Sequence, residues 1–517
     1  MMKSPDGDQR SGADTYILLL MPLGCAYLFW SWTHQLVGFG GDNALYVLMA
    51  QAYSPYGHPA NEVASYFAGH SQFPPLYPLV LALFDGGYEL LIAHLVTTAC
   101  LLTAFPLLMT WARALGLPMP VGFLVTIAFA LLPGTYAQTL YLHSENLYLL
   151  LTLLLFNLTA TKNPPIRHQY AAAVVVAAVT LTRSAGLTLV VAYFCYLARN
   201  RHRRWIWQAS VAIIPMIAWN IYAYTSGSHY VSSVLPEDGG DLFARLAARV
   251  AMQWSALKYG WLVNMSGSGV LSVYSIALGA MCLIGSVVRL FLWRIDGVYV
   301  AAYFVLLLLW PFPAEAARLM IVLVPILLVQ GAWLAHTLIS RVGQPKYSFL
   351  AGLAVPLIAL MVALPDVAQT LQRFRIALPV SLEAYRRDPS FVSGTQMDAV
   401  LNANMNRALV TAVKSLSDDV PEGECIFAIK PSIVGYFSGR VSKAPPGAAL
   451  SESDFRSALD RAGCRHFLLM NMAPPSFNTP FYPLNRLHNR IRILRSYHVT
   501  EDAASPVAAQ IGELIED

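Results

Sequence analysis

Long apolar runs separated by short polar segments dominate residues 15–366 of this chain. A helix that crosses the hydrocarbon core of a bilayer needs roughly 20 mainly apolar residues. Eleven runs approach or reach that length, and we predict a membrane-spanning helix for each. The predicted spans are residues 15–35, 88–111, 118–133, 146–161, 169–182, 185–198, 206–224, 268–291, 297–312, 317–338 and 348–366.

The pattern changes after residue 366, where apolar residues become less dense. Residues 425–429 and 466–470 have the pattern of strands, and residues 451–463 between them have that of a helix. We therefore predict a small α/β domain in this part of the chain. The predicted organisation is an N-terminal segment (1–14), a transmembrane domain (15–366) and the α/β domain (367–517).

The composition excludes an ordinary soluble protein, because 56% of the 517 residues are apolar, 12% are charged and the mean hydropathy is +0.51. The net charge of +5 does not indicate nucleic-acid binding, because the basic residues form short clusters between apolar runs and there report membrane orientation. The first run lacks a small-x-small cleavage site, so we predict a retained helix and not a signal peptide.

Basic clusters decide whether residues 169–198 form one long helix or two short ones. Lys162 and Arg167 precede this stretch, and four arginines between 199 and 204 follow it. The positive-inside rule places both clusters on the cytoplasmic face, which requires an even number of crossings between them. We therefore predict two helices that turn at Arg183 on the outer surface. The N-terminus is then cytoplasmic and the C-terminal domain extracytoplasmic.

This topology places most of the polar residues suited to catalysis on one side of the membrane. The outer loops are residues 36–87, 134–145, the turn at Arg183, 225–267 and 312–318. Two of them agree with the assignment, because residues 39–87 and 134–145 contain no lysine or arginine.

Asp42 lies in the first outer loop, directly before a helix-compatible apolar run. One interpretation is a helix cap, because an aspartate carboxylate accepts the first free amide protons of a helix. The other is a general base held at the membrane surface, within hydrogen-bond reach of an acceptor hydroxyl or amine. The sequence alone leaves both open.

Glu145, Arg183 and Arg318 face the same compartment in this topology. Glu145 is either a favourable carboxylate at a helix N-terminus or part of a polar cavity. Each arginine alone fits a membrane anchor. Two arginines on the side of Asp42 and Glu145 instead favour a site for an anionic lipid headgroup, because guanidinium grips phosphate through two parallel hydrogen bonds.

Cys425 and Cys464 are the only two of the six cysteines in the predicted outer domain. An oxidising compartment permits a disulfide between them. Two buried free thiols are the alternative, because cysteine often serves as a small apolar residue.

Taken in order, the motifs of the chain resemble those of the C-type glycosyltransferases. Within that family they resemble the bacterial branch that includes the lipid A aminoarabinose transferases and relatives of the protein O-mannosyltransferases. The motifs are Asp42, the Pro-Pro-Leu-Tyr-Pro element (74–78), Ser144-Glu145, Thr182-Arg183-x-x-Gly186, the segment from Arg318-Leu319 to Pro325, and Gly-Tyr-Phe-Ser-Gly-Arg (435–440). They cover most of the chain.

The resemblance implies an inverting transfer of a sugar from a polyprenyl-phosphate donor, outside the cytoplasm, by a multi-pass protein of the bacterial inner membrane. Asp42 is then the base, and Arg183 and Arg318 bind the donor phosphate. The acceptor is an unknown glycan, lipid or protein. The residues expected in the substrate pocket are Glu145, Tyr46, His70, Tyr77 and Glu315.

Two positions depart from the family pattern. Members often carry a second acid directly after the first, where this chain has Asn43, and charged residues before the proline pair, where it has Gln72 and Phe73. The sequence therefore leaves open whether a divalent metal is a cofactor. Glu62, His70 and His229 remain candidate ligands.

Two other classes of function use the same features. A lipid or lipid-linked sugar flippase would use the charged cavity without cleaving a bond, although the chain shows no inverted repeat. A scaffold without catalysis would use the outer domain to bind a partner. Sugar transfer by the purified protein distinguishes the enzyme from both.

Overall fold

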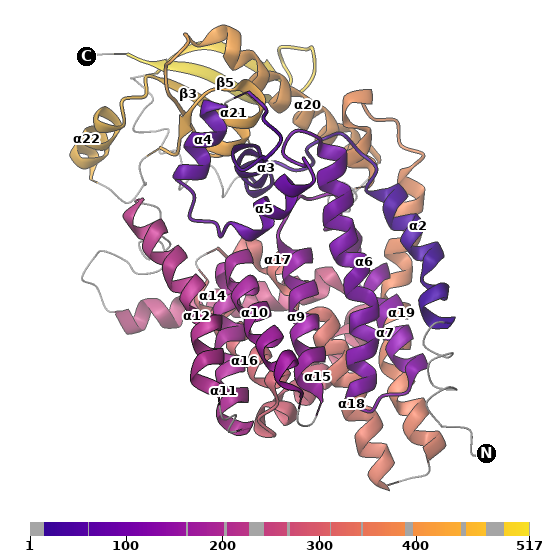
Figure 1. Ribbon diagram of the computed structural model, residues 1–517. Helices are drawn as coiled ribbons and strands as arrows, with labels where there is room; N and C mark the ends of the chain where they lie inside the picture. The colour runs from indigo at the N-terminus through magenta and orange to yellow at the C-terminus, as the bar shows by residue number, and fades with distance from the viewer. Residues whose placement is uncertain are drawn as a thin grey trace.

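A helical bundle carries a small sheet domain at one end in the computed structural model of the chain (Figure 1). The structure describes residues 15–59, 61–161, 164–200, 204–226, 242–265, 269–310, 312–342, 345–387, 396–445, 451–471 and 491–515. Helices from the first and last thirds of the bundle lie side by side, with α19 (Pro345–Arg373) packed on α7 (Met119–Leu131) and α18 (Val324–Val342). The bundle is therefore closed by contacts distant in sequence.

Helices occupy all eleven predicted spans. They are α2 (Met21–Trp30), α6 (Leu90–Ala114), α7, α9 (Glu145–Ala160), α10 (Ile166–Thr182), α11 (Leu187–Asn200), α12 (Trp205–Thr225), α15 (Val270–Phe291), α16 (Ile295–Leu309), the pair α17 (Ala316–Met320) and α18, and α19. Within the described residues, α6, α12, α15 and α19 are long and apolar enough to cross a membrane, whereas α7, α9 and α16 are shorter apolar helices. The apolar helices make this a membrane protein, and the count of eleven spans stays a prediction.

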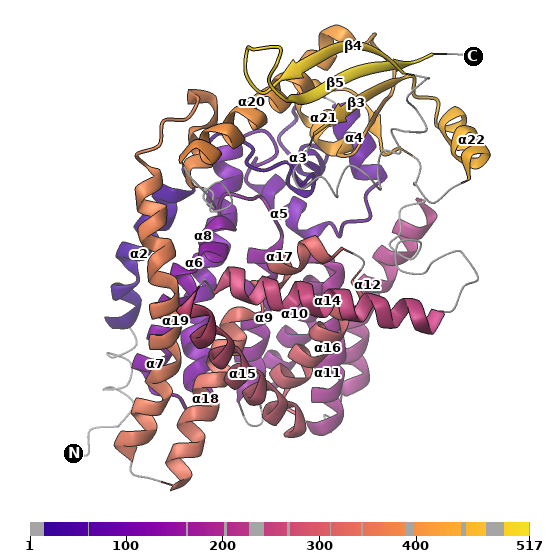
Figure 2. The same cartoon turned by 180° about the vertical axis from the view of Figure 1, so that it is seen from behind.

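The stretch 169–198 is two helices, as predicted, and they meet at Arg183 and the single turn η1 (Ser184–Gly186). Two other predicted elements differ from the structure. The predicted span 317–338 is interrupted after α17. The predicted loop 225–267 contains α14 (Leu242–Asn264), which crosses the bundle helices instead of running along them (Figure 2). The helix α14 did not stand out as an apolar run because charged residues, Arg249 and Lys258 among them, interrupt it.

The first loop of the chain is largely helical and lies between the bundle and the sheet. It contains α3 (Asp42–Ala52), α4 (Glu62–Gly69) and α5 (Leu76–Leu83). Pro75 directly precedes α5, where its missing amide proton costs no helical hydrogen bond. A short helix, α8 (Pro133–Ala137), and the turns η2 (Pro313–Glu315) and η3 (Val380–Arg387) complete this end of the bundle.

The C-terminal domain has the predicted mixed α/β character. Its five-stranded sheet has the order β2-β1-β3-β5-β4, with β1 parallel to β2 and β3, and β5 antiparallel to β3 and β4. The strands are β1 (Ile426–Ala428), β2 (Ser442–Lys443), β3 (His466–Met470), β4 (Ile491–His498) and β5 (Val507–Leu514). The helices are α20 (Gln396–Asp419), α21 (Pro431–Ser438) and α22 (Glu452–Ala462). Both predicted strands and the helix between them are confirmed.

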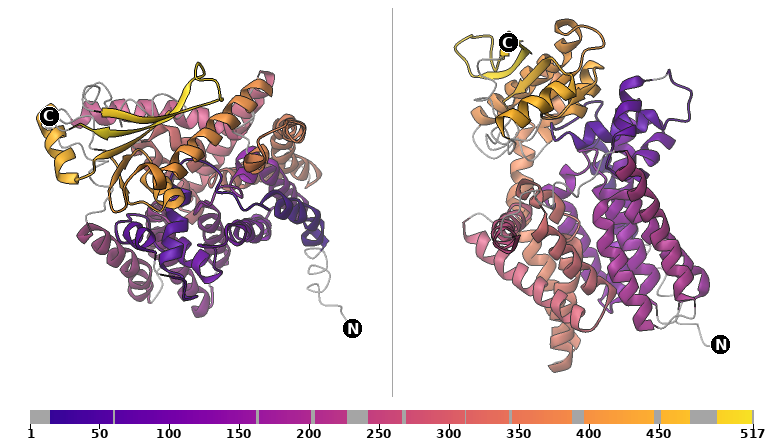
Figure 3. Two further views of the ribbon diagram at one scale, coloured as in Figure 1. Left: turned by 90° about the horizontal axis from the view of Figure 1, so that it is seen from above. Right: turned by 90° about the vertical axis from the view of Figure 1, so that its left-hand side faces the viewer.

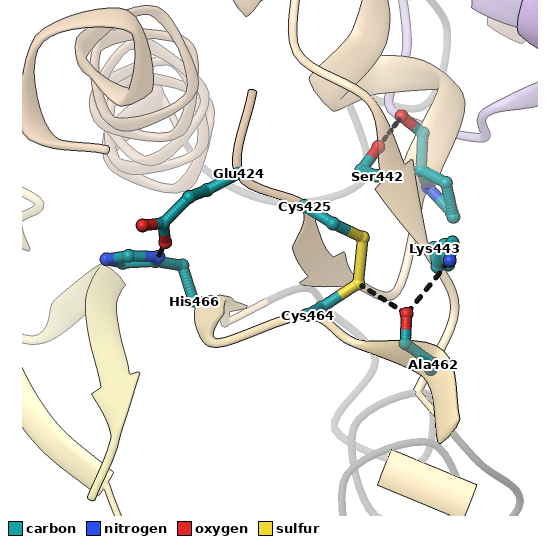
Figure 4. The surroundings of a disulfide bond; sticks show 8 residues. Glu424, Cys425, Ser442, Lys443, Ala462, Cys464 and His466 are labelled. Atoms are coloured by element: carbon teal, nitrogen blue, oxygen red, sulfur yellow. Dashed lines mark hydrogen bonds and ion pairs between the residues drawn. A yellow bond between two sulfur atoms is a disulfide. The ribbon is translucent and has the colours of Figure 1, made fainter. Parts of the chain in front are cut away.

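A disulfide between Cys425 and Cys464 joins the starts of β1 and β3 (Figure 4). The two Cα atoms are 4.6 Å apart. Of the two alternatives left open by the sequence, the structure therefore contains the bridge. Beside it, His466 Nδ1 lies 2.8 Å from Glu424 Oε2.

The C-terminal domain rests directly on the helices of the first loop (Figure 3). Gly435 of α21 lies against Phe67 of α4 so closely that an added Cβ would be 2.4 Å from the ring. The apolar core is continuous across this contact, because Tyr46 and Tyr77 of the loop share one buried cluster with Ile433 and Leu468 of the domain. The domain is thus held by burial and not by a linker alone.

Candidate functional site

Four charged side chains form a continuous chain of ion pairs between the bundle and the C-terminal domain. Asp42 Oδ2 lies 2.7 Å from Arg318 Nη1, and Arg318 Nε lies 3.4 Å from Glu145 Oε1. The same Glu145 oxygen lies 2.6 Å from Arg183 Nη1. Glu145 is buried with 2% of its side chain exposed, whereas Asp42 keeps 25%. The cluster is therefore open to solvent at the Asp42 end.

Asp42 owes its direction to the turn before α3. Gly41 is the residue before the helix and has φ +93°, a conformation that favours glycine. Asp42 is the first residue of α3, and no side chain caps this end of the helix. Its carboxylate goes to Arg318 instead. The interpretation of Asp42 as a helix cap is therefore wrong in this structure.

The two arginines come from breaks between helices. Arg183 ends α10, and Gly186 makes the tight turn feasible because a Cβ there would be 2.7 Å from Thr180 Cα. Arg318 lies on α17. The helix α14 holds α17 in place, because Asn264 Nδ2 donates a 2.8 Å hydrogen bond to the Ala317 carbonyl oxygen. The unexpected helix α14 thus positions one of the predicted phosphate-binding residues.

Most of the residues predicted for the substrate pocket surround this chain of charges. Glu315 Oε2 is 2.8 Å from Arg318 Nε. Tyr46 OH lies 3.0 Å from Ser144 Oγ, which also accepts a 3.2 Å hydrogen bond from Arg183 Nη1. Tyr77 packs edge-on against Tyr46 with ring centres 5.0 Å apart. Burial raises the pKa of Tyr46, so its hydroxyl stays neutral.

His70 has a different environment. Its Nδ1 lies 2.8 Å from the carbonyl oxygen of Tyr66, and its ring stacks on that of Tyr66, on the outside of α4. The structure therefore pairs His70 with its own helix and not with the ion-pair chain.

His143 is a member of the site that the sequence did not single out. It is 7% exposed, and its Nε2 lies 3.5 Å from Arg318 Nη1. Arginine can only donate, so Nε2 is the accepting nitrogen and Nδ1 carries the proton. In the part of the chain that the structure describes, Nδ1 has no hydrogen-bond partner. Its place directly before Ser144-Glu145 is the only sequence signal.

The pKa values of Asp42 and His143 are both lowered. Burial opposes the charge on Asp42, but Arg318, His143 and Lys430 outweigh it and bring the pKa of the carboxyl below its usual value. Burial, with Arg318 beside it, lowers the pKa of His143 to about 4. At neutral pH the site therefore combines an ionised Asp42 with a neutral imidazole.

Asn43 holds the position where a second acid was looked for. It is 1% exposed and donates to the carbonyls of Val37 and Gly38 over 2.7 and 2.9 Å. A carboxylate cannot make those bonds. Among the described residues, no group of three His, Cys, Asp or Glu side chains is placed to hold a metal ion. The candidate ligand His229 lies outside the described residues.

A small gap with room for about one water molecule lies beside Glu145, at the buried end of the ion-pair chain. Its lining includes Thr135, Asn146, Leu101 and Ile321.

No protein-family model matches the sequence, and the search of curated proteins found no match either. Among solved structures, the chain is similar to ArnT from Cupriavidus metallidurans in the apo state, with a TM-score of 0.51, 10% identity, and 97% of this chain and 98% of that chain covered. That protein bound to undecaprenyl phosphate gives a TM-score of 0.47 at 10% identity, covering 96% and 98%.

An oligosaccharyltransferase from Archaeoglobus fulgidus, tethered with an acceptor peptide, gives a TM-score of 0.44 at 10% identity, covering 96% of this chain and 74% of that one. The fold assignment does not rely on the comparisons with TM-scores of 0.47 and 0.44. The apo ArnT comparison shows the fold over nearly the whole chain, and the resemblance inferred from the order of the motifs is confirmed at that level.

Proposed function

We propose that the protein is an inverting glycosyltransferase of a bacterial cytoplasmic membrane, which moves a sugar from a polyprenyl-phosphate donor to an acceptor on the extracytoplasmic face. Asp42 is the base, and Arg183 and Arg318 bind the donor phosphate. The acceptor is a glycan, a lipid or a protein. The fold shared with ArnT agrees with this class of reaction.

The observation that carries the proposal is the ion-pair chain from Asp42 through Arg318 and Glu145 to Arg183. Ionisable groups buried beside apolar helices are expensive and are usually functional. Both guanidiniums contact the buried carboxylate of Glu145, so they are already held close together and lose little freedom when a phosphate arrives. This arrangement suits an anionic headgroup delivered from a bilayer.

In the proposed reaction, the acceptor oxygen or nitrogen attacks the anomeric carbon of the donor sugar. One bond forms there while the bond from that carbon to the phosphate oxygen breaks, and the polyprenyl phosphate leaves with the electron pair. Asp42 takes the proton of the acceptor. Negative charge grows on the phosphate as the bond breaks, and Arg183 and Arg318 stabilise it. No step is routed through a metal ion.

The ion pair between Arg318 and Asp42 implies that the donor binds before the base becomes available. In the structure Arg318 Nη1 is paired with Asp42 Oδ2, which makes this carboxylate a weaker base than a carboxylate without an ion pair. A donor phosphate competes for the same guanidinium and releases Asp42. The base therefore becomes available after the donor has bound, which limits futile attack by water.

The rival function is a flippase for lipid-linked sugars. The purified protein, in lipid nanodiscs, is given a panel of polyprenyl-phosphate sugars together with candidate acceptors, and mass spectrometry follows released polyprenyl phosphate and glycosylated product. The proposal requires both products. Movement of labelled donor between the leaflets of proteoliposomes, with no release in any mixture, would favour the flippase.

A further inference from the structure

Lys430 of the C-terminal domain lies beside the base, although it is 388 positions away in the chain. It directly precedes α21, and its Cδ is 3.2 Å from the position that a Cβ on Gly41 would take. Asp42 is the next residue after Gly41, and the Lys430 ammonium is one of the charges that act on its carboxylate. The contact places a cation of one domain at the catalytic residue of the other.

Ser432 fixes this contact. It is 7% exposed, and its hydroxyl donates a 2.7 Å hydrogen bond to the carbonyl oxygen of Gly41. Gly435, one turn further along α21, packs against Phe67 and Val63 of α4. The segment that carries Lys430 is therefore seated at two points on the loop that carries Asp42.

The net charge of the ion-pair cluster indicates a role for Lys430. Among the described residues, the three carboxylates of Asp42, Glu145 and Glu315 form ion pairs with the two guanidiniums of Arg183 and Arg318. Without a further cation the cluster holds one excess negative charge, which repels an incoming phosphate. Lys430 balances this negative charge at the Asp42 end of the cluster, which is open to solvent. Glu145, further along the ion-pair chain, is buried.

We propose that Lys430 is a positioning residue for the transfer reaction, which admits a phosphate oxyanion to the site and keeps Asp42 ionised, and that the docking of α21 on Gly41 brings it there. This inference rests on the proposed function. It makes the C-terminal domain part of the site and not only a cover for the membrane domain.

The test uses the full chain in nanodiscs and compares Lys430→Met, Lys430→Arg and Lys414→Met. Lys414 is an exposed lysine of α20 in the same domain, so its variant matches the change in charge. Lys430→Met should raise the donor KM, and the dissociation constant of a polyprenyl phosphate without sugar, roughly tenfold, the value of one charge-assisted hydrogen bond. Lys430→Arg should recover most of the loss, and Lys414→Met should match the wild type.

The pH profile separates positioning from a structural role. The charged or titratable groups that act on or respond to Asp42 are Arg318 on α17, His143 before α9, Lys430 before α21 and Tyr46 on α3. Loss of the lysine makes Asp42 easier to protonate, so the acid limb of kcat/KM should move to higher pH in Lys430→Met. Folding is checked by the thermal stability of each variant, and Ser432→Ala should shift both readouts in the same direction.

The outcomes are distinct. A rise confined to the acceptor KM, with normal binding of polyprenyl phosphate, would overturn the role of Lys430 toward the donor phosphate. Normal phosphate binding and an unshifted profile in a folded Lys430→Met protein would overturn the inference. If the wild type binds polyprenyl phosphate but transfers no sugar, the proposed function fails, while the binding comparison still decides the role of Lys430.

Discussion

Arg318 holds Asp42 through a 2.7 Å ion pair although 276 positions separate them in the chain. Asp42 is the first residue of α3, in the first loop of the chain, and Arg318 lies on a short helix that interrupts a late apolar run. The pair therefore joins the proposed base to the proposed phosphate site, and most of the predictions below depend on it.

Asp42→Asn should lower kcat roughly 10²- to 10⁴-fold, the usual range for a general base, while donor binding is retained. The asparagine oxygen can still accept from Arg318, so the loss comes from the missing negative charge. Donor binding and turnover are measured separately on the purified variant. Wild-type turnover by a folded Asp42→Asn protein would remove the assignment and make Glu145 the next candidate.

Arg183→Ala and Arg318→Ala should each weaken donor binding or slow transfer roughly 10- to 100-fold, because a hydrogen bond to a charged group contributes about 1.5–3 kcal/mol. Lysine should rescue only in part, since it lacks the planar fork. Arg318→Ala should cost more, because that guanidinium contacts three carboxylates. Arg495→Ala, an exposed arginine of β4, is the control. An arginine whose alanine variant behaves like the wild type is a membrane anchor.

Activity should persist well into the acid range. The pKa of Asp42 is lowered from its ordinary value, because the neighbouring cations outweigh burial, so the acid limb of kcat/KM should lie at lower pH than for an ordinary aspartate and far below the pH at which a histidine titrates. An acid limb at pH 6 to 7 would point to a histidine instead.

Stability should respond to pH through His143. The folded protein protonates this side chain only near pH 4, whereas an unfolded chain does so near 6.5. Unfolding therefore takes up a proton between these values, and stability should fall as pH falls from 6.5 to 4. Thermal unfolding in detergent measures the slope. His143→Asn should flatten it, and an equal slope in that variant would contradict the role of His143.

Removing the Cys425–Cys464 disulfide should destabilise the C-terminal domain by about 4 kcal/mol, because the bridge closes a loop of 39 residues in the unfolded chain. Paired Ser variants and non-reducing mass spectrometry of the protein from its native membrane test this. Two free thiols in that protein would show that the bridge is not made there.

The proposed topology predicts a cytoplasmic signal from reporters fused at residues 163 and 202, and an extracytoplasmic signal from a fusion at 400. A signal at 202 from the outer side would mean that α10 and α11 do not return the chain to the inner face, and it would separate Arg183 from Asp42.

Local pattern predicted the bundle helices, β1, β3 and α22, but not every element of the chain. The apolar runs predicted the bundle helices because each must cover its length with apolar side chains, and β3 begins and ends at the predicted residues for the same reason. The break at Arg183 followed from counting basic clusters. The helix α14 was missed, because it buries only one face and carries charges on the other.

The choice of Asp42, Glu145, Arg183 and Arg318 as one group also came from the sequence, through a shared compartment and the order of the motifs. Which atoms meet did not, because ion pairs between residues 38 to 276 positions apart depend on how the bundle closes. Only the tertiary structure turned Asp42 from a helix cap toward Arg318, brought His143 into the cluster and seated Lys430 beside Gly41. Those contacts depend on the packing of separate elements, which no local pattern of residues encodes.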